Sequence, residues 1–344
     1  MGYWLRLPMG ITPLISLSVP VYGTESSLPA LLDSVLEQGF LSDSAAGQGA
    51  LPLEIIVVND GSPSGFSLPK ILKPYKKKFK TLGIPLTLLE HSKNLGLVEA
   101  RRTAVEAASG TCLCFADSDD TLPPNALQSL YDAALSSGAD IVHGKAEYKA
   151  AFSEEEAALY KKDSLAEMEE KIKKVCLGRL EKDELLNSFL IKGELSSFLW
   201  GKLFRTETVK AAFADIPRTF CTMGEDFLIY FFILLHARSY FGIEDTVYTY
   251  HIGTGISSSR EIKDLSRWER ACTAASVFAI VFSYLEEHPF SSPNKNELMA
   301  ALQNRCKNNM LSNLRHLKRV IPSLRDEAYK ILCDYWGEEY VKAD

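Results

Sequence analysis

The chain has 344 residues, of which 46% are hydrophobic and 24% charged, and its formal net charge is −6. This composition is typical of a folded globular protein, and the acidic balance argues against a nucleic-acid partner. The seven cysteines are odd in number and include no CxxC pair, which argues against a disulfide framework or a zinc ribbon and suits a reducing cytoplasm. Residues 1–10 lack the features of a signal peptide, and no apolar run reaches the roughly 18 residues that span a bilayer. We therefore expect a cytoplasmic protein without a transmembrane helix.

Strand and helix patterns alternate along the first part of the chain. Short apolar runs predict buried strands at residues 14–21, 53–58, 86–90 and 112–116. Helical spacing is found at residues 28–37 and 98–109, with a Lys-rich helix between the second and third strands and a loop at residues 39–52. This alternation predicts an α/β fold, a mostly parallel sheet flanked by helices, in which ligands bind beyond the carboxyl ends of the strands.

The second half of the chain changes character. Residues 150–195 carry closely interleaved opposite charges, which predict a solvated helical excursion. Sheet-like and turn signals return at residues 198–205 and 246–259. We expect one α/β domain over residues 12–259, followed by a C-terminal helical extension over residues 260–344.

The tail from Ile262 onward reads as helices that break at Pro289 and Pro322. Six basic side chains make one stretch of this tail locally basic, and they lie beside apolar ones at helical spacing. They are Arg305, Lys307, Arg315, His316, Lys318 and Arg319. Two interpretations are open: an amphipathic helix that packs on the protein, or a peripheral contact with anionic lipid at the inner face of the membrane.

An acidic turn, Asp117-Ser118-Asp119-Asp120, follows the fourth predicted strand. Carboxylates at positions i and i+2 after a strand can both face a crevice, and hard oxygen ligands suit Mg²⁺ or Mn²⁺. Such an ion would neutralise the charge of a departing diphosphate. The alternative is a capped turn, because Asp and Ser are common at helix starts and Pro123-Pro124 suits a first turn.

Two further acidic sites are candidates for ligand binding or catalysis. Asp60 lies in a turn after the second strand, where it either accepts hydrogen bonds from a nucleobase or ribose or serves the turn alone. Glu225 and Asp226 precede an apolar segment at residues 227–235, which would raise the pKa of a carboxylate and suit it to act as a general base. The alternative is a helix N-terminus, where the helix dipole favours acidic residues.

The order of these motifs along the chain is more specific than any one of them. The series is Pro20-Val21-Tyr22, Asn59-Asp60-Gly61-Ser62, Asn94-Leu95-Gly96 with Arg101, Asp117-Ser118-Asp119-Asp120, Trp200-Gly201-Lys202-Leu203 and Gly224-Glu225-Asp226. It resembles the family 2 glycosyltransferases, which are inverting enzymes with the GT-A fold. The resemblance covers roughly residues 12–259 and leaves out the helical tail.

On the donor side, the resemblance implies that Tyr22 and Asp60 hold the uracil or other base, with Pro20 in the same motif as Tyr22. Asn94 and Arg101 match loop and helix positions that help to frame the nucleotide. The expected donor is therefore a nucleotide-diphosphate sugar, with a UDP-sugar as the first choice.

At the reacting centre, the resemblance implies that Asp117 lies near the ribose and the metal. Asp119 matches the principal ligand of Mn²⁺ or Mg²⁺, through which the diphosphate is held. Asp226 matches the general base that acts on the acceptor hydroxyl, and Glu225 supports the same site.

The acceptor side and the late loop show both agreement with the family pattern and departures from it. Trp200 and Lys202 match a motif on the acceptor side. Gly23 stands where many members carry Asn, and His251 and Gly253 stand where many carry Arg and His in a closing loop. His251 is either a substitute metal ligand or a structural residue.

Together, the resemblance implies an inverting, metal-dependent transfer of a sugar to a hydroxyl of a glycan or lipid-linked acceptor, in bacterial surface polysaccharide synthesis. A sugar nucleotidyltransferase is one alternative, but it would carry a Gly-rich nucleotide loop near the N-terminus, which residues 19–25 do not form. The other alternative is a non-catalytic nucleotide-sugar-binding protein. The intact acids Asp117, Asp119 and Asp226 argue against it.

Overall fold

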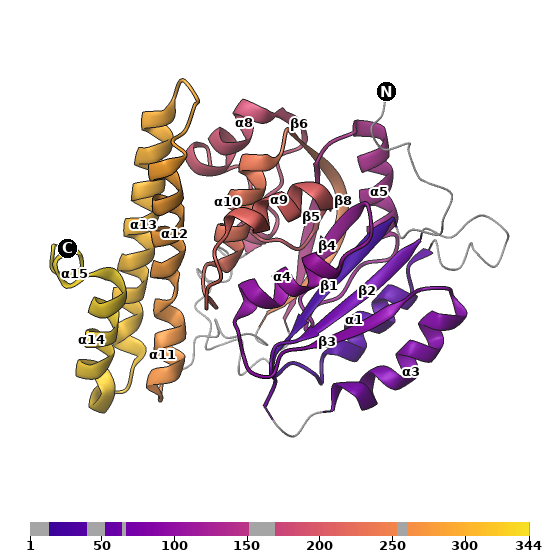
Figure 1. The fold of residues 1–344 in the computed structure, drawn as a ribbon, viewed down its shortest axis with the longest axis horizontal. Helices are drawn as coiled ribbons and strands as arrows, with labels where there is room; N and C mark the ends of the chain where they lie inside the picture. Colours follow the sequence, from indigo (N-terminus) through magenta and orange to yellow (C-terminus); the bar gives the residue numbers. More distant parts are fainter. Residues whose placement is uncertain (1–13, 40–51, 64–66, 151–168, 253–260, 344) are drawn as a thin grey trace.

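The computed structural model describes residues 14–39, 52–63, 67–150, 169–252 and 261–343. A central sheet carries helices on both faces, and the C-terminal helices form a further layer beside it (Figure 1). Among the described residues, no helix is long and apolar enough to cross a membrane. All seven cysteines are free thiols, as expected.

In the described part of the chain, eight strands form one sheet in the order β3-β2-β1-β4-β7-β5-β8-β6. The strands are β1 (Ile15–Val21), β2 (Leu53–Asn59), β3 (Leu86–Glu90), β4 (Cys112–Phe115), β5 (Ile141–Ala150), β6 (Gly178–Glu181), β7 (Lys202–Arg205) and β8 (Ser239–Ile252). The first four strands are parallel, as is the pair β5 and β8, whereas β7 and β6 run antiparallel to their neighbours. The predicted α/β fold is confirmed, and the first four strands lie within a residue of the predicted runs.

Helices cover both faces of this sheet because its strands are apolar on both sides. Along β2, Ile55 and Val57 pack into one core and Ile56 and Val58 into the other, as the alternation of a strand requires. The first core is covered by α1 (Leu28–Leu36), α3 (Leu68–Thr81) and α5 (Ala126–Ser137). The second is covered by α4 (Leu97–Ala107), α8 (Lys182–Leu186), the π-helical turn η3 (Asn187–Ile191), α9 (Thr206–Asp215) and α10 (Glu225–His236).

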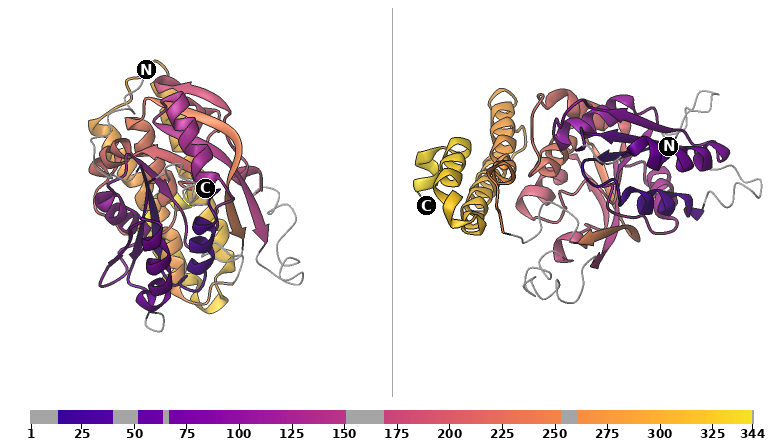
Figure 2. Two further views of the ribbon diagram at one scale, coloured as in Figure 1. Left: turned by 90° about the vertical axis from the view of Figure 1, so that its right-hand side faces the viewer. Right: turned by 90° about the horizontal axis from the view of Figure 1, so that it is seen from below.

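The second core continues without a break into the C-terminal helices. These are α11 (Leu265–Cys272), α12 (Ala274–Glu287), α13 (Lys295–His316), η4 (Leu317–Arg319), η5 (Pro322–Leu324), α14 (Arg325–Trp336) and α15 (Glu338–Lys342). Phe227 of α10 packs against Phe278 of α12, and their ring centroids are 5.5 Å apart. Figure 2 shows these helices gathered at one end of the molecule, beside α10. The predicted helical extension is therefore confirmed.

The helical excursion predicted at residues 150–195 is only partly right. Residues 151–168 lie outside the described part of the chain, as does most of the loop predicted at residues 39–52. Residues 178–181 form an edge strand, β6, and Leu185 and Phe189 beyond it are fully buried. Charged residues continue as far as Glu194, but the apolar side chains of Leu185 and Phe189 between them pack into the second core.

Candidate active site

The carboxyl ends of β1, β2 and β4 meet the N-terminus of α10 around a cleft of about 750 Å³. Many of the predicted site residues line this cleft. They are Pro20, Tyr22, Asp60, Asn94, Asp117, Asp119, Glu225 and Asp226. Three others, Arg101, Trp200 and Lys202, are buried behind its walls. The parallel strands thus bring together polar residues that lie far apart in the sequence.

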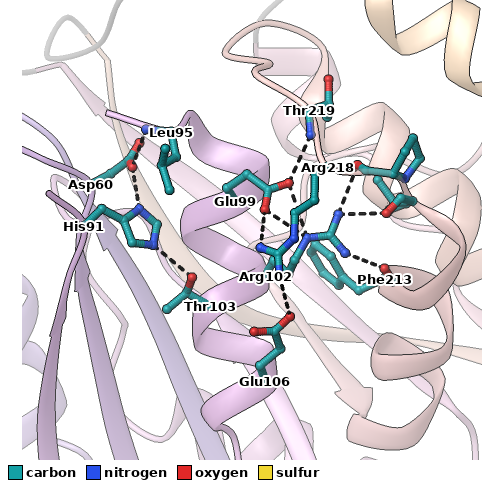
Figure 3. Close-up of polar contacts among 12 residues, drawn as sticks. Asp60, His91, Leu95, Glu99, Arg102, Thr103, Glu106, Phe213, Arg218 and Thr219 are labelled. Carbon is teal, nitrogen blue, oxygen red and sulfur yellow. Dashed lines mark hydrogen bonds and ion pairs between the residues drawn. The ribbon is translucent and has the colours of Figure 1, made fainter. Parts of the chain in front are cut away.

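The carboxylate of Asp60 is buried at the end of β2 and holds the loop that leads into α4 (Figure 3). Its Oδ1 accepts a hydrogen bond from the N–H of Leu95 at 2.8 Å, and its Oδ2 accepts one from Gly96 at 3.0 Å. The ring of His91 lies 2.7 Å from Oδ1 and reaches the hydroxyl of Thr103 on α4 at 2.9 Å. Asp60 therefore shapes this side of the cleft as well as lining it.

The turn after Asp60 requires a glycine. Gly61 has a φ of +67°, and a Cβ at this position would meet the carbonyl carbon of Lys93 at 2.3 Å. The loop of residues 93–96 can therefore cross close to the end of β2 only because residue 61 has no side chain.

The other side of α4 carries a second polar network, which holds the segment that precedes α10 (Figure 3). Arg102 donates to both carboxylate oxygens of Glu99 and to the main-chain carbonyl of Phe213. Glu99 also accepts hydrogen bonds from Nη1 of Arg218 at 2.7 Å and from the N–H of Thr219 at 3.2 Å. One side of α4 is therefore linked to Asp60 at the end of β2, and its other side is linked to the segment that precedes α10. Helix α4 thereby sets the distance between Asp60 and the start of α10.

Arg101 of α4 is 1% exposed and pairs with acids from two separate motifs. Its Nη1 lies 2.7 Å from Oδ1 of Asp226 and 3.5 Å from Oε1 of Glu225, and its Nη2 lies 3.1 Å from Oδ1 of Asp117. Burial alone would lower the pKa of Arg101, but the three carboxylates outweigh burial and raise the pKa above its usual value. The structure thus places the guanidinium beneath the acids, whereas the motif had suggested a place beside the nucleotide.

The acidic turn after β4 presents two carboxylates to the cleft and buries a third. Asp117 and Asp119 line the cleft, whereas Asp120 is 1% exposed. Asp120 accepts hydrogen bonds from the hydroxyl of Tyr248 and from the N–H of His251, both at 2.7 Å. The Tyr248 hydroxyl in turn accepts from the N–H of Asp117 at 3.0 Å. Asp120 therefore fixes the turn to β8, an arrangement that the sequence did not indicate.

Burial changes the proton affinity of the acids around Arg101. It raises the pKa of Asp117 well above its usual value, although Arg101 opposes the shift. It also raises the pKa of Glu225 to about 7, with Asp226 adding to the shift and Arg101 again opposing it. Both Glu225 and Asp226 lie in the first turn of α10, which starts after Gly224. The two interpretations of this motif, a helix N-terminus and a desolvated acid, therefore both apply.

Trp200 and Lys202, which were expected on the acceptor side, support the cleft wall from behind. The Trp200 ring stacks between Phe198 and Tyr248, with centroid distances of 4.4 and 4.7 Å. Nζ of Lys202 donates to the main-chain carbonyl of Phe198. Phe198 and Tyr250 are the aromatic residues of this group that line the cleft.

The C-terminal helices contribute cleft residues that the motifs did not predict. Arg267 and Arg270 of α11 and Arg305 of α13 line the cleft. Arg305 was grouped with a basic tail, of which Lys307 and Arg315 are exposed. The sequence contained a signal that Arg305 differs from the exposed members of this group. The buried residues of α13 include Leu298, Leu302, Cys306 and Met310, and Arg305 lies three residues after Leu302, on the same side of the helix.

Asp117 and Asp119, from the turn after β4, both present carboxylate oxygens to the cleft and could hold a divalent cation there. Among the residues that the structure describes, no group of three or more His, Cys, Asp or Glu side chains could hold a metal ion. An ion that is held by one or two carboxylates and by donor phosphates needs no such group. The proposed ligand role of His251 stays a prediction, and residues 253–260 of the predicted closing loop lie outside the described chain.

Comparisons with known proteins indicate a family for part of the chain. Residues 16–180 match the family model for glycosyl transferase family 2. The chain is 29% identical over 245 residues to the protein EpsH of Bacillus subtilis, covering 70% of this chain and 61% of EpsH. The chain thus spans less than two thirds of the length of this curated relative.

Two solved structures share the fold. One is TarS 1–349 of S. aureus in complex with UDP-GlcNAc, with a TM-score of 0.52, 19% identity, and coverage of 96% of this chain and 92% of that one. The other is the mannosyltransferase PcManGT of Pyrobaculum calidifontis in complex with GDP-Man and Mn²⁺, with a TM-score of 0.53, 16% identity, and coverage of 99% and 87%.

The sheet, its acidic strand ends and these structural neighbours define a GT-A glycosyltransferase fold. Residues 16–180 match glycosyl transferase family 2, the family that the motifs predicted. That match ends before Glu225, so the α10 acids and the C-terminal helices lie beyond it.

Proposed function

We propose that this chain is an inverting glycosyltransferase. It would move a sugar from a nucleotide diphosphate, most simply UDP, to a hydroxyl of a glycan or lipid-linked acceptor in bacterial surface polysaccharide synthesis. The structures of TarS and PcManGT with sugar nucleotides support such a donor. The donor would lie along Pro20, Tyr22, Asp60 and Asn94, all of which line the cleft.

The observation that carries the proposal is the arrangement of acids around Arg101. Asp117 from the strand-end turn and Asp226 from α10 both contact this one guanidinium, so the two motifs lie at one site. The first motif would be placed for the diphosphate, and the second for the acceptor. A single-displacement transfer needs separate groups for the diphosphate and for the acceptor, because the leaving group and the attacking hydroxyl lie on opposite sides of the anomeric carbon.

Asp226 would act as the general base. Its Oδ1 accepts a charge-assisted hydrogen bond from Arg101, which fixes the carboxylate in one orientation. Its side chain is 19% exposed and lines the cleft, so an acceptor hydroxyl can reach it. A proton transferred from that hydroxyl to Asp226 would leave an oxygen nucleophile, and no covalent enzyme intermediate is needed.

Asp119, with Asp117, would hold Mn²⁺ or Mg²⁺. When bound, the cation would neutralise the charge of the departing diphosphate. PcManGT was solved with Mn²⁺, which supports the proposed metal dependence. Arg101 keeps Asp117 in place from below, so that its carboxylate stays at the cleft surface.

The proposal is tested by calorimetry of UDP binding with and without Mn²⁺, followed by assay of UDP release from UDP-sugars. Wild-type protein should bind UDP more tightly with Mn²⁺, and Asp119→Asn should lose most of this metal-dependent gain while remaining folded. Equal metal-dependent affinity in the two proteins would remove Asp119 from the site. Binding of UDP-sugars without turnover on any acceptor would favour the non-catalytic alternative.

A further inference from the structure

One wall of the cleft is built by the C-terminal helices, which lie outside the family match over residues 16–180. This wall carries Arg267 and Arg270 on α11, and Arg305 with Asn309 on α13. The α/β part of the molecule contributes Asp60 and the acids around Arg101 to the same cleft. The charges of the cleft are therefore separated, with carboxylates on the α/β side and guanidinium groups on the helical side.

Arg305 is held in a fixed position beside the proposed catalytic acid. Its guanidinium carbon lies 4.8 Å from the ring centroid of Phe227 and 5.0 Å from that of Phe189. Phe227 directly follows Asp226 in the first turn of α10. Stacking on two aromatic rings orients a guanidinium and costs it part of its hydration.

The charge of Arg305 is not matched by a nearby carboxylate among the described residues, since none forms a salt bridge with it within the usual 4 Å limit. Burial lowers the pKa of this side chain, and no described acid opposes the shift. A partly desolvated guanidinium that faces a cleft without an acidic partner is a binding group for an anion.

The arginines of α11 are also fixed relative to the acids. The main-chain carbonyl of Arg270 accepts hydrogen bonds from the hydroxyls of Thr222 and Thr273, at 3.4 and 2.6 Å. Thr222 lies two residues before Gly224, so α11 is joined directly to the segment that presents Asp226. On the far side of α11, Nε1 of the buried Trp268 donates to the carbonyl of Ala328 at 2.7 Å.

From this geometry we infer that the acceptor is an anion, and that Arg270 and Arg305, with Arg267, bind a phosphate group that lies near its accepting hydroxyl. Arginine presents a planar pair of donors that matches phosphate oxygens, whereas hydroxyl groups of a neutral glycan have no need of several guanidinium groups. The proposed place of the donor diphosphate is at Asp119, in the turn after β4, whereas these arginines lie on α11 and α13. This inference rests on the proposed function and specifies its acceptor.

Two sources share this chemistry: a polyol chain linked by phosphodiesters, and a sugar on a prenyl diphosphate. Both place a phosphate close to a free hydroxyl. The experiment therefore has two arms, an oligomer of glycerol phosphate and a sugar linked to a short prenyl diphosphate. Each is titrated by calorimetry into the full chain, after saturation with UDP and Mn²⁺.

The variants are Arg270→Gln, Arg305→Gln and Arg305→Lys, with Arg315→Gln as the control. Arg315 lies on the same helix as Arg305 but is exposed and away from the cleft. We expect wild type to bind at least one of the anions, and each Gln variant to bind it roughly 10- to 100-fold more weakly. Arg305→Lys keeps the charge and the packing of the stem, so it should fold normally and lose only part of the affinity. Arg315→Gln should match wild type.

UDP affinity is measured first on every protein. If the Gln variants lose UDP affinity, the arginines belong to the donor site and the inference is overturned. It is also overturned if neither anion binds the UDP-loaded wild type, or if all variants bind the anion equally. Failure of UDP itself to bind would instead overturn the proposed function, and this result is distinguished because it precedes the anion titrations.

Discussion

Nη1 of Arg101 lies 2.7 Å from Oδ1 of Asp226, although the two residues are 125 positions apart in the chain. The same guanidinium contacts Asp117, so one buried cation joins the acidic turn after β4 to the first turn of α10. Its Nη1 also lies 3.5 Å from Glu225. The site therefore depends on a residue that does not itself face the cleft.

Arg101→Met should destabilise the protein by about 3–5 kcal/mol, because it leaves buried carboxylates without their counter-charge. Urea denaturation at neutral pH measures the loss in the free energy of unfolding. Arg101→Lys keeps the positive charge but cannot bind two carboxylates through separate nitrogens, so its loss in the free energy of unfolding should be smaller. A stability of Arg101→Met equal to that of wild type would show that the acids do not need this partner.

Asp60→Ala should weaken UDP binding by roughly 1–3 kcal/mol, the range expected when a buried hydrogen-bonding partner is lost. The carboxylate accepts hydrogen bonds from the N–H groups of Leu95 and Gly96 and also lines the cleft, so the substitution would affect both the loop position and the proposed contact with the base. Calorimetry of the folded variant gives the change. Thr103→Val removes only the hydrogen bond between the His91 ring and the Thr103 hydroxyl, so it should weaken UDP binding less. An unaltered UDP dissociation constant in Asp60→Ala would exclude Asp60 from donor binding.

Asp226→Asn should lower the rate of sugar transfer by a factor on the order of 10² to 10⁴, since an amide cannot take up the acceptor proton. UDP affinity should change little, because the base acts on the acceptor. Steady-state transfer rates and calorimetry test both statements, with the exposed Asp132→Asn as a control for the substitution itself. Near wild-type transfer by Asp226→Asn would direct attention to Glu225. Loss of UDP binding would instead assign this acid to the donor side.

Glu225 should make transfer depend on pH near neutrality. Burial and then Asp226 raise the pKa of Glu225 to about 7, so this side chain loses its proton as the pH rises through that value. The resulting negative charge beside Asp226 favours proton uptake from the acceptor, and kcat/KM should therefore increase from pH 6 to pH 8. Glu225→Gln should flatten this part of the pH profile. If the variant keeps the same inflection, another group is responsible for it.

Lys202 should make folding stability rise with pH above neutrality. Burial lowers the pKa of Lys202 to about 7, against an opposing effect of Asp226, while the unfolded chain keeps the usual value of 10.5. Between these values the unfolded state binds a proton that the folded state does not, so stability increases with pH by at most about 1.4 kcal/mol per unit. Lys202→Met removes the contribution of this side chain to the pH dependence of stability. Urea denaturation at pH 7, 8 and 9 should show wild type gaining stability relative to the variant, and parallel curves would contradict the prediction.

Much of the α/β fold could be predicted from the sequence because its signals are local. Apolar runs mark β1 to β4, and polar turns such as the one at Asp60 mark the ends of those strands. In a parallel sheet those ends must share one edge, so a common site for Asp60 and Asp117 followed from topology alone. The edge strand β6 was missed, because charge patterning is a weak guide to a short strand that is stabilised by its neighbour.

The sequence by itself therefore determined the match to family 2, the strand ends and the acids that line the cleft. The tertiary structure decided which charges meet: Arg101 lies beneath the acids, Lys202 is buried behind the wall, and Arg305 points into the cleft. These outcomes depend on packing between segments that are distant in the chain, where burial sets both the geometry and the proton affinity of a side chain. Local sequence patterns describe which faces of a helix are apolar, but they do not specify what each face is packed against.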